Sequence, residues 1–114
     1  MIGSGIKKSN WGYYLSGILL FLSCSPSPEK NRSEVFTIEI RQMQFHPAEL
    51  KVKKGDTVVF INRDFITHDV TEQLDKSWTS APLTSGKSWS MVVTGTVDYY
   101  CSIHPVMKGR LIEE

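Results

Sequence analysis

Short segments that alternate between apolar and polar residues restrict most of this chain to an all-β fold. In residues 35–41, Phe36, Ile38 and Ile40 alternate with polar side chains, which predicts a strand with one buried face. Residues 57–61 are β-branched or aromatic throughout, which predicts a strand buried on both faces. The predicted strands are residues 35–41, 50–53, 57–61, 68–71, 88–93, 97–101 and 109–113. About seven to eight short strands between turn signals, with no convincing helical pattern, predict a Greek-key β-sandwich.

The first 23 residues have the pattern of a signal peptide rather than of a strand. Lys7 and Lys8 form a positive segment, and residues 11–22 form a mostly apolar run. Such a run fits the apolar region of a signal peptide and is too short for a comfortable membrane span. We therefore expect residues 1–23 to be a leader that precedes the folded domain.

Cys24 follows this apolar run after one residue, in the sequence Leu-Ser-Cys, which looks like a lipoprotein processing site with diacylation at Cys24. The fit is imperfect because such sites favour Leu where Phe21 stands. An uncleaved N-terminal anchor helix and plain secretion are the alternatives. Residues 24–33 are polar and contain Pro, which predicts a flexible tether that leads to a domain at residues 34–114.

The charge of the predicted domain argues against nucleic acid as a partner. Residues 34–114 contain nine Lys or Arg and eleven Asp or Glu, a net charge of −2. A nucleic-acid-binding domain would need a basic surface to neutralise phosphates. We expect an exported, monomeric domain whose partners are proteins and, through Cys24, a membrane.

Three residues near the C-terminus form the motif Cys-x-x-His-x-x-Met, namely Cys101, His104 and Met107. Their thiolate, imidazole and thioether groups favour copper over hard cations such as Mg²⁺, and two His with one Cys and a weak axial Met form a blue-copper electron-transfer site. The second imidazole is expected from His68, which a Greek-key arrangement would bring beside Cys101. A buried free Cys101, with His104 merely capping a turn, is the alternative.

Residues 35–113 resemble the plastocyanin/azurin family of cupredoxins. The matching segments are Phe45-His46-Pro47, residues 52–58, Asn62-Arg63-Asp64 before His68, and residues 95–109. The two-residue gap between His104 and Met107 is most similar to the amicyanin branch. The resemblance implies a type 1 copper protein with one copper ion and four ligands, His68, Cys101, His104 and Met107.

Asp69 departs from the family's pattern, which usually has Asn directly after the first His ligand. In the family that side chain ties the two ligand loops together, so the substitution leaves the rigidity of the site and its pH dependence open. We expect Asp69 and Ser102, each next to a ligand in the sequence, to support the ligands.

Two further predictions concern the surface. We expect the ring edge of His104 to reach the surface through Pro105 and Val106 and to serve as the electron port, with ordinary loop packing as the alternative. His46 precedes Pro47 and is expected to be a solvated loop residue, with a second metal role as the alternative.

The motif and the resemblance together predict a single-electron carrier between redox proteins outside the cytoplasm, not an enzyme. The first alternative is a copper carrier that delivers or buffers the metal, which a chelator should strip readily. The second is a metal-free or zinc-bound interaction module, which would lack the colour of a copper thiolate.

Overall fold

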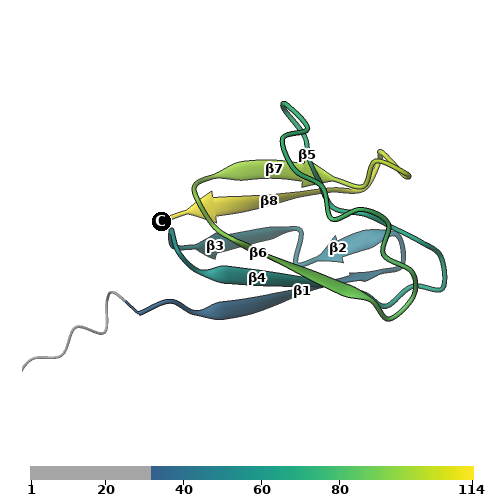
Figure 1. Ribbon diagram of the computed structural model, residues 1–114, viewed down its shortest axis with the longest axis horizontal. Coiled ribbons are helices and arrows are strands. Elements are labelled where there is room, and N and C mark those ends of the chain that lie inside the picture. The colour runs from purple at the N-terminus through teal and green to yellow at the C-terminus, as the bar shows by residue number, and fades with distance from the viewer. Residues whose placement is uncertain (1–31) are drawn as a thin grey trace, which may run out of the picture. The chain divides into compact units, whose positions relative to one another are not determined.

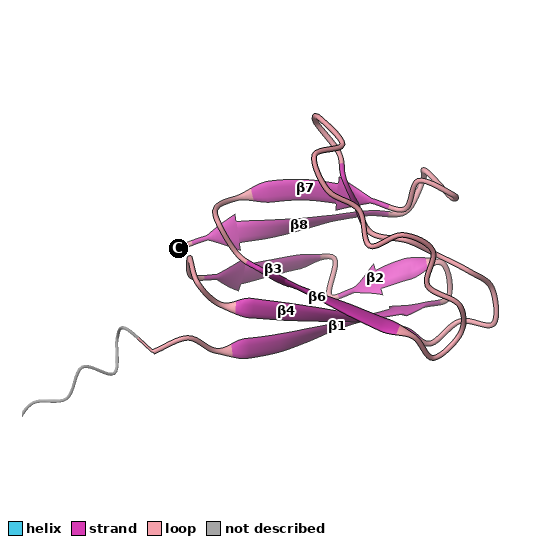
Figure 2. Ribbon diagram, in the orientation of Figure 1, coloured by secondary structure: helices cyan, strands magenta, loops and turns pink. Residues whose placement is uncertain are grey.

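The computed structural model describes residues 32–114, which form two facing four-stranded sheets (Figure 1). The strands of this part of the chain are β1 (Val35–Arg41), β2 (Gln44–His46), β3 (Glu49–Val52), β4 (Thr57–Asn62), β5 (Thr71–Glu72), β6 (Ser88–Val92), β7 (Val97–Tyr100) and β8 (Lys108–Glu113). Loops connect all of them, and residues 32–114 contain no helix (Figure 2). The predicted all-β sandwich is therefore confirmed.

Each sheet contains both parallel and antiparallel pairs. The first sheet has the order β2-β1-β4-β6, and the second has the order β3-β8-β7-β5. In the first, β1 and β4 run parallel, from the pair Val35 and Thr57 onward. In the second, β3 and β8 run parallel, and β7 pairs with both β8 and β5 in antiparallel register. The C-terminus of β8 lies at the end of the sandwich opposite the β4–β5 and β7–β8 loops (Figure 1).

The core fills the space between the sheets and contains a cluster of aromatic rings. Ile38 and Ile40 of β1 and Phe60 of β4 are fully buried, as the alternation of their strands predicts. The ring of Tyr99 meets the ring of Phe60 edge to face, with the centroids 5.1 Å apart. Burial of each large apolar side chain of this kind stabilises the fold by about 1.5–3 kcal/mol.

A glycine on β8 makes room for the Tyr99 ring. Gly109 lies opposite Tyr99 in the β7–β8 pair, and a Cβ atom at Gly109 would overlap atoms of the Tyr99 side chain. A side chain at position 109 would therefore displace the buried Tyr99 ring.

Three details differ from the strands predicted from the sequence. The predicted burial of residues 57–61 on both faces is wrong, because Val58 and Phe60 are buried whereas the alternate residues Thr57, Val59 and Ile61 are only half-buried. Residues 68–71 form no continuous strand, since His68 makes only an isolated bridge to Leu83 before β5 begins at Thr71. β2 was not predicted, because its turn uses Gln42 and Met43 in left-handed backbone conformations that usually favour Gly or Asn.

Several predictions fall on residues outside the described part of the chain. These are the leader at residues 1–23, the acylated Cys24 and most of the tether at residues 24–33. Within residues 32–114, no helix has the length and apolarity required to cross a membrane.

Candidate metal centre

The segment from Cys101 to Met107 is a tight loop between β7 and β8 that hydrogen bonds to itself. The N–H of Cys101 donates to the carbonyl of Met107 at 3.1 Å, and the N–H of Met107 donates to the carbonyl of His104 at 2.9 Å. A third bond joins the N–H of His104 to the carbonyl of Cys101 at 3.2 Å. These bonds fix the relative positions of the three residues of the motif.

Cys101 points into the sandwich because the alternation of β7 continues one residue past its end. Tyr99 and Cys101 are both fully buried, as the predicted inward face of this strand requires. Cys101 carries a free thiol. Its Sγ accepts a hydrogen bond from the backbone N–H of Asp69 at 3.4 Å, which links it to the β4–β5 loop.

His68 reaches the same place from the β4–β5 loop. Its N–H donates to the carbonyl of Leu83 at 3.1 Å, and its carbonyl accepts the N–H of Leu83 at 2.7 Å. These two bonds hold the backbone of His68 against the β5–β6 loop. The imidazole is fully buried, and its Nδ1 lies 3.7 Å from Cys101 Sγ.

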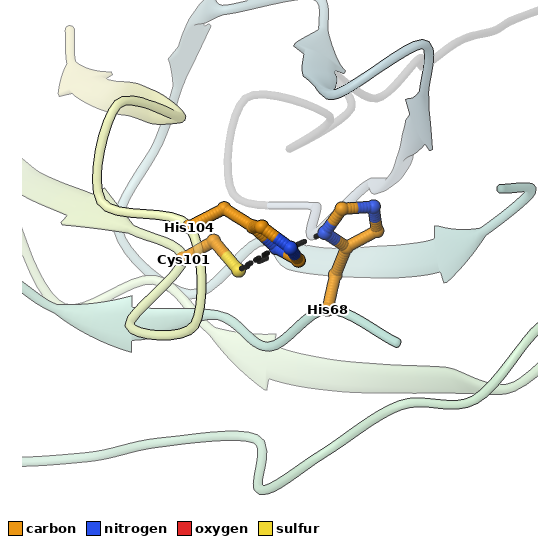
Figure 3. Close-up of side chains that lie close together, drawn as sticks. All are labelled: His68, Cys101 and His104. Atoms are coloured by element: carbon orange, nitrogen blue, oxygen red, sulfur yellow. Dashed lines mark hydrogen bonds between the residues drawn. The ribbon is translucent and has the colours of Figure 1, made fainter. Parts of the chain in front are cut away.

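His104 completes a cluster of three metal-binding groups (Figure 3). Its Nδ1 also lies 3.7 Å from Cys101 Sγ, and the donor atoms of the three residues all lie within 4.8 Å of one another. Metal–donor bonds of about 2.0–2.3 Å place two donors of a trigonal site roughly 3.6 Å apart. The two sulfur–nitrogen separations of 3.7 Å therefore fit a single metal ion bound between the sulfur and the two imidazoles.

Met107 lies at the C-terminal end of the same loop and is almost completely buried. It belongs to the same buried cluster as Cys101. A thioether is a soft ligand that suits copper and adds little to a site for a hard cation. The loop therefore supplies a thioether in addition to the thiol and the two imidazoles, and this set of soft and borderline donors suits copper.

A family scan matches residues 14–112 to the cupredoxin-like domain. This chain belongs to the cupredoxin-like family. The match begins inside the segment predicted to be a leader, so the domain boundary at residue 34 stays a prediction.

Among known cupredoxins, the chain is similar to amicyanins. It is 35% identical over 83 residues to amicyanin of Paracoccus denitrificans, a match that covers 68% of this chain and 63% of that protein. It is 30% identical over 83 residues to amicyanin-alpha of Methylorubrum extorquens, covering 68% of this chain and 70% of that one. The solved structure of a mutant amicyanin with Cu(I) superposes with a TM-score of 0.65 at 31% identity, covering 70% of this chain and 82% of that chain. The resemblance to the amicyanin branch is therefore confirmed.

In this cupredoxin, Asp69 links the two loops that carry the clustered residues. Its Oδ1 accepts the backbone N–H of Ser102 at 2.7 Å, and its Oδ2 accepts the Ser102 hydroxyl. Thr71 Oγ1 donates to Asp69 Oδ1 at 3.2 Å. The carboxylate thus joins the β4–β5 loop to the loop that follows β7, as expected of a residue that supports the ligands.

Asp64 lies beside the cluster of this cupredoxin and was not predicted as a site residue. Its Oδ2 lies 2.8 Å from His68 Nε2, on the side of the ring away from Cys101. Burial opposes its ionisation, but hydrogen bonds from two backbone N–H groups and from the His68 ring outweigh burial and lower the pKa of the carboxyl. Its place in the matching segment Asn62-Arg63-Asp64, four residues before His68, was the signal that could have identified it.

His46 is not the solvated loop residue that was predicted. It ends strand β2 and pairs with Glu39 of β1, and its side chain is partly buried. Its Nε2 is buried and has no hydrogen-bond partner among the described residues. Strand pairing places it there, and it is not part of the cluster around Cys101.

The ligand-loop end of this cupredoxin exposes several apolar side chains. His104 is half-buried, whereas Pro105 is exposed and Val106 is 83% exposed. From the β4–β5 loop, Phe65 is 99% exposed, which is unusual for a large aromatic side chain. We call Phe65, Ile66, Ile103, Pro105 and Val106 the apolar rim.

Proposed function

We propose that this protein is a type 1 copper protein that carries single electrons between redox proteins and is not itself an enzyme. One copper ion would be bound by His68, Cys101, His104 and Met107. The observation that carries this proposal is the convergence of one thiol and two imidazoles, from loops 33 residues apart, beside a closed loop that ends in Met107. The presence of Cu(I) in the related amicyanin structure supports the same metal.

The bound copper would supply one-electron redox chemistry by alternating between Cu(I) and Cu(II). The protein's contribution is to keep the ligands still, because a site that rearranges at every transfer exchanges electrons slowly. The backbone bonds within the loop, the Leu83 bridge and the Asp69–Ser102 link all limit such movement. Cys101 binds as thiolate, so copper loading releases a proton.

We further propose that electrons pass through His104 and that the apolar rim is where a redox partner docks. His104 is half-buried, its Nδ1 lies 3.7 Å from the buried Cys101 Sγ, and the two residues that follow it, Pro105 and Val106, are exposed. Exposed apolar side chains that gather on one part of a surface mark a site where another protein can bind.

Export and membrane attachment belong to the same proposal and rest on the sequence alone. A periplasmic or other cell-envelope location, with a lipid on Cys24, would hold the domain near membrane-bound partners. Expression with labelled fatty acid should label the wild-type chain and leave Cys24→Ala unlabelled. Labelling of both chains, or of neither, would contradict acylation at Cys24.

Optical and EPR spectra of the purified protein after addition of Cu(II) test the copper centre. We expect an intense thiolate-to-copper charge-transfer band and a narrow copper hyperfine splitting. Cys101→Ser should abolish both, because it removes the thiolate and leaves the fold intact. A colourless complex would contradict a type 1 centre, and rapid loss of copper to a chelator would instead indicate a copper carrier.

A further inference from the structure

We infer that the free edge of the first sheet is an interface between two copies of this chain, formed by antiparallel pairing of strand β6 with the same strand of a second copy. The inference does not depend on copper, and the strand contains none of the residues of the proposed metal centre. The monomer predicted from the sequence is then the form of the protein at low concentration.

Strand β6 has a neighbouring strand on one side only, because it is the last strand of the first sheet (Figure 1). It pairs with β4 in antiparallel register over its whole length. The side chains of Trp89 and Met91 pack against the core, whereas Ser88, Ser90 and Val92 are exposed. The exposed residues therefore lie where the sheet meets solvent.

The ladder between β4 and β6 decides which backbone groups face outward. In an antiparallel pair, hydrogen-bonded residue pairs alternate with pairs that exchange no hydrogen bond. The N–H of Asn62 donates to the carbonyl of Lys87 at 2.9 Å, so the bonded positions are 87, 89, 91 and 93. The N–H and C=O groups of Ser88, Ser90 and Val92 therefore point away from β4, and within residues 32–114 they have no backbone partner.

The other sheet edges in residues 32–114 are protected in ways that β6 is not. Strand β2 has three residues and is followed by Pro47, which has no N–H to donate. Strand β5 has two residues, and β3 carries the charged residues Glu49 and Lys51 at alternate positions. Strand β6 has five residues, none of them charged and none of them proline. An edge without these features is open to pairing with another strand.

A two-fold axis at Ser90 makes β6 complementary to itself. Ser90 then faces Ser90 of the second copy, and Ser88 faces Val92. These are the outward-facing positions, so each pair exchanges two hydrogen bonds. Trp89 faces Met91 in the same register, and contact between a thioether and an aromatic ring is favourable. A second copy therefore satisfies both the free backbone groups and the half-buried side chains of the edge.

This arrangement keeps both metal centres accessible. Ser88 begins β6 opposite Ile61, at the end of β4 from which the β4–β5 loop starts. The two copies of β6 run in opposite directions, so the ligand loops of the two copies lie toward opposite ends of the pair. Lys87, the charged residue that precedes the strand, falls opposite Val93 and meets no like charge in this register.

Sedimentation velocity of the full-length protein at a series of concentrations tests the association, under reducing conditions that exclude disulfides. We expect a monomer–dimer equilibrium with a Kd on the order of 0.1 mM, because a five-residue edge is small for an interface. Ser90→Lys should weaken association by about tenfold or more, since it places two positive charges opposite each other on the axis.

Thr37→Lys is the matched control. Thr37 is exposed and lies in the same cross-strand row as Ser90, through Val59, but on strand β1, which is paired on both sides. It adds the same charge away from the edge, so it should leave the Kd unchanged. Ser90→Pro is a second variant, because the N–H that it removes points away from β4 and the β4–β6 ladder is retained.

Amide hydrogen exchange measured by NMR locates the interface. The N–H groups of Ser88, Ser90 and Val92 should exchange more slowly as the concentration rises. Those of Trp89 and Met91 should not change with concentration, because they are already bonded to β4.

A protein that stays monomeric at about 1 mM would overturn the inference. Equal weakening by Ser90→Lys and Thr37→Lys would overturn it in favour of face-to-face packing of sheets, and weakening by Val106→Ser in favour of association through the apolar rim. Protection of the outward N–H groups at every concentration would show that another part of the same chain covers the edge, and would also contradict the dimer.

Discussion

At the scale of single residues, the motif and one distant His were sufficient to predict which side chains would meet. Cys101 and His104 are local to one loop, so their spacing in the sequence is directly informative. His68 was identified because few other imidazoles exist and the sandwich had to supply one. Asp64 was missed because a carboxylate on a polar loop suggests nothing by itself, and only its place four residues before His68 in the matching segment could have identified it.

Met107→Leu should leave the centre coloured and raise its reduction potential. A Leu side chain has a similar volume, so the stability of the metal-free protein should fall by less than about 1.5 kcal/mol. Loss of the thioether removes a weak donor that stabilises the oxidised ion. A redox titration monitored by absorbance measures the shift, and an unchanged potential would indicate that Met107 is not a ligand.

At the scale of strands, alternation predicted the elements that face the core and missed those defined by pairing alone. The sequence predicts β1 and β7 from the alternation of their apolar residues, and β4 from its run of β-branched and aromatic residues. In β1 and β4 the buried residues do lie at every second position. β2 has three residues, and its pairing with β1 follows from an unusual turn that has no glycine. The segment after His68 depends on a bridge to Leu83, a contact between distant residues that no local pattern records.

Gly109→Ala should destabilise the β7–β8 pair. The added methyl group would overlap the buried Tyr99 side chain, and overpacking of this kind costs about 1–3 kcal/mol. Urea denaturation of the metal-free protein, followed by tryptophan fluorescence, measures the difference. An unchanged midpoint would mean that the Tyr99 ring can move aside without loss.

Tyr99→Phe, unlike Gly109→Ala, is not expected to destabilise the protein. The Tyr99 hydroxyl is buried and has no hydrogen-bond partner among the described residues, and burial raises the pKa of this phenol. Removal of an unpaired buried hydroxyl should leave the free energy of unfolding unchanged or raise it by up to about 1 kcal/mol. The same denaturation experiment tests this, and a large loss of stability would reveal an unseen partner of the hydroxyl.

At the scale of the whole molecule, acid should unfold the metal-free protein partly through Glu72. Its carboxylate accepts hydrogen bonds from the N–H groups of Ser77, Asp75 and Leu74, and these lower the pKa of Glu72 to about 2. A group whose pKa is lower in the folded state adds stability above its ordinary value of 4.5, and that stability is lost as the pH falls toward 2.

Glu72→Gln should therefore reduce the dependence of stability on pH between those two values. Urea denaturation at a series of pH values measures this, with Glu49→Gln as a control because Glu49 is exposed on β3. Equal pH dependence in both variants would contradict a special role for Glu72.

Docking of a partner also belongs to the scale of the whole molecule, because the proposed docking face combines side chains from two different loops. Phe65→Ser and Val106→Ser should slow electron transfer with a redox partner and leave the reduction potential unchanged. Leu74→Ser is the matched control, since Leu74 is 83% exposed but lines a hollow with Thr96 and Val97, where β7 begins. Stopped-flow kinetics measures the rates, and equal slowing by all three changes would contradict a localised docking face.

The parallel pairing of β3 with β8 has a consequence for how the chain assembles. Glu49 and Arg110 are neighbours in this pair although 61 residues separate them. Closing so long a stretch of chain is slow, and it cannot happen before β8 has been synthesised. The metal-binding end is completed only when β8 is in place, so a newly made polypeptide has no finished cavity for an ion until it has reached its native topology.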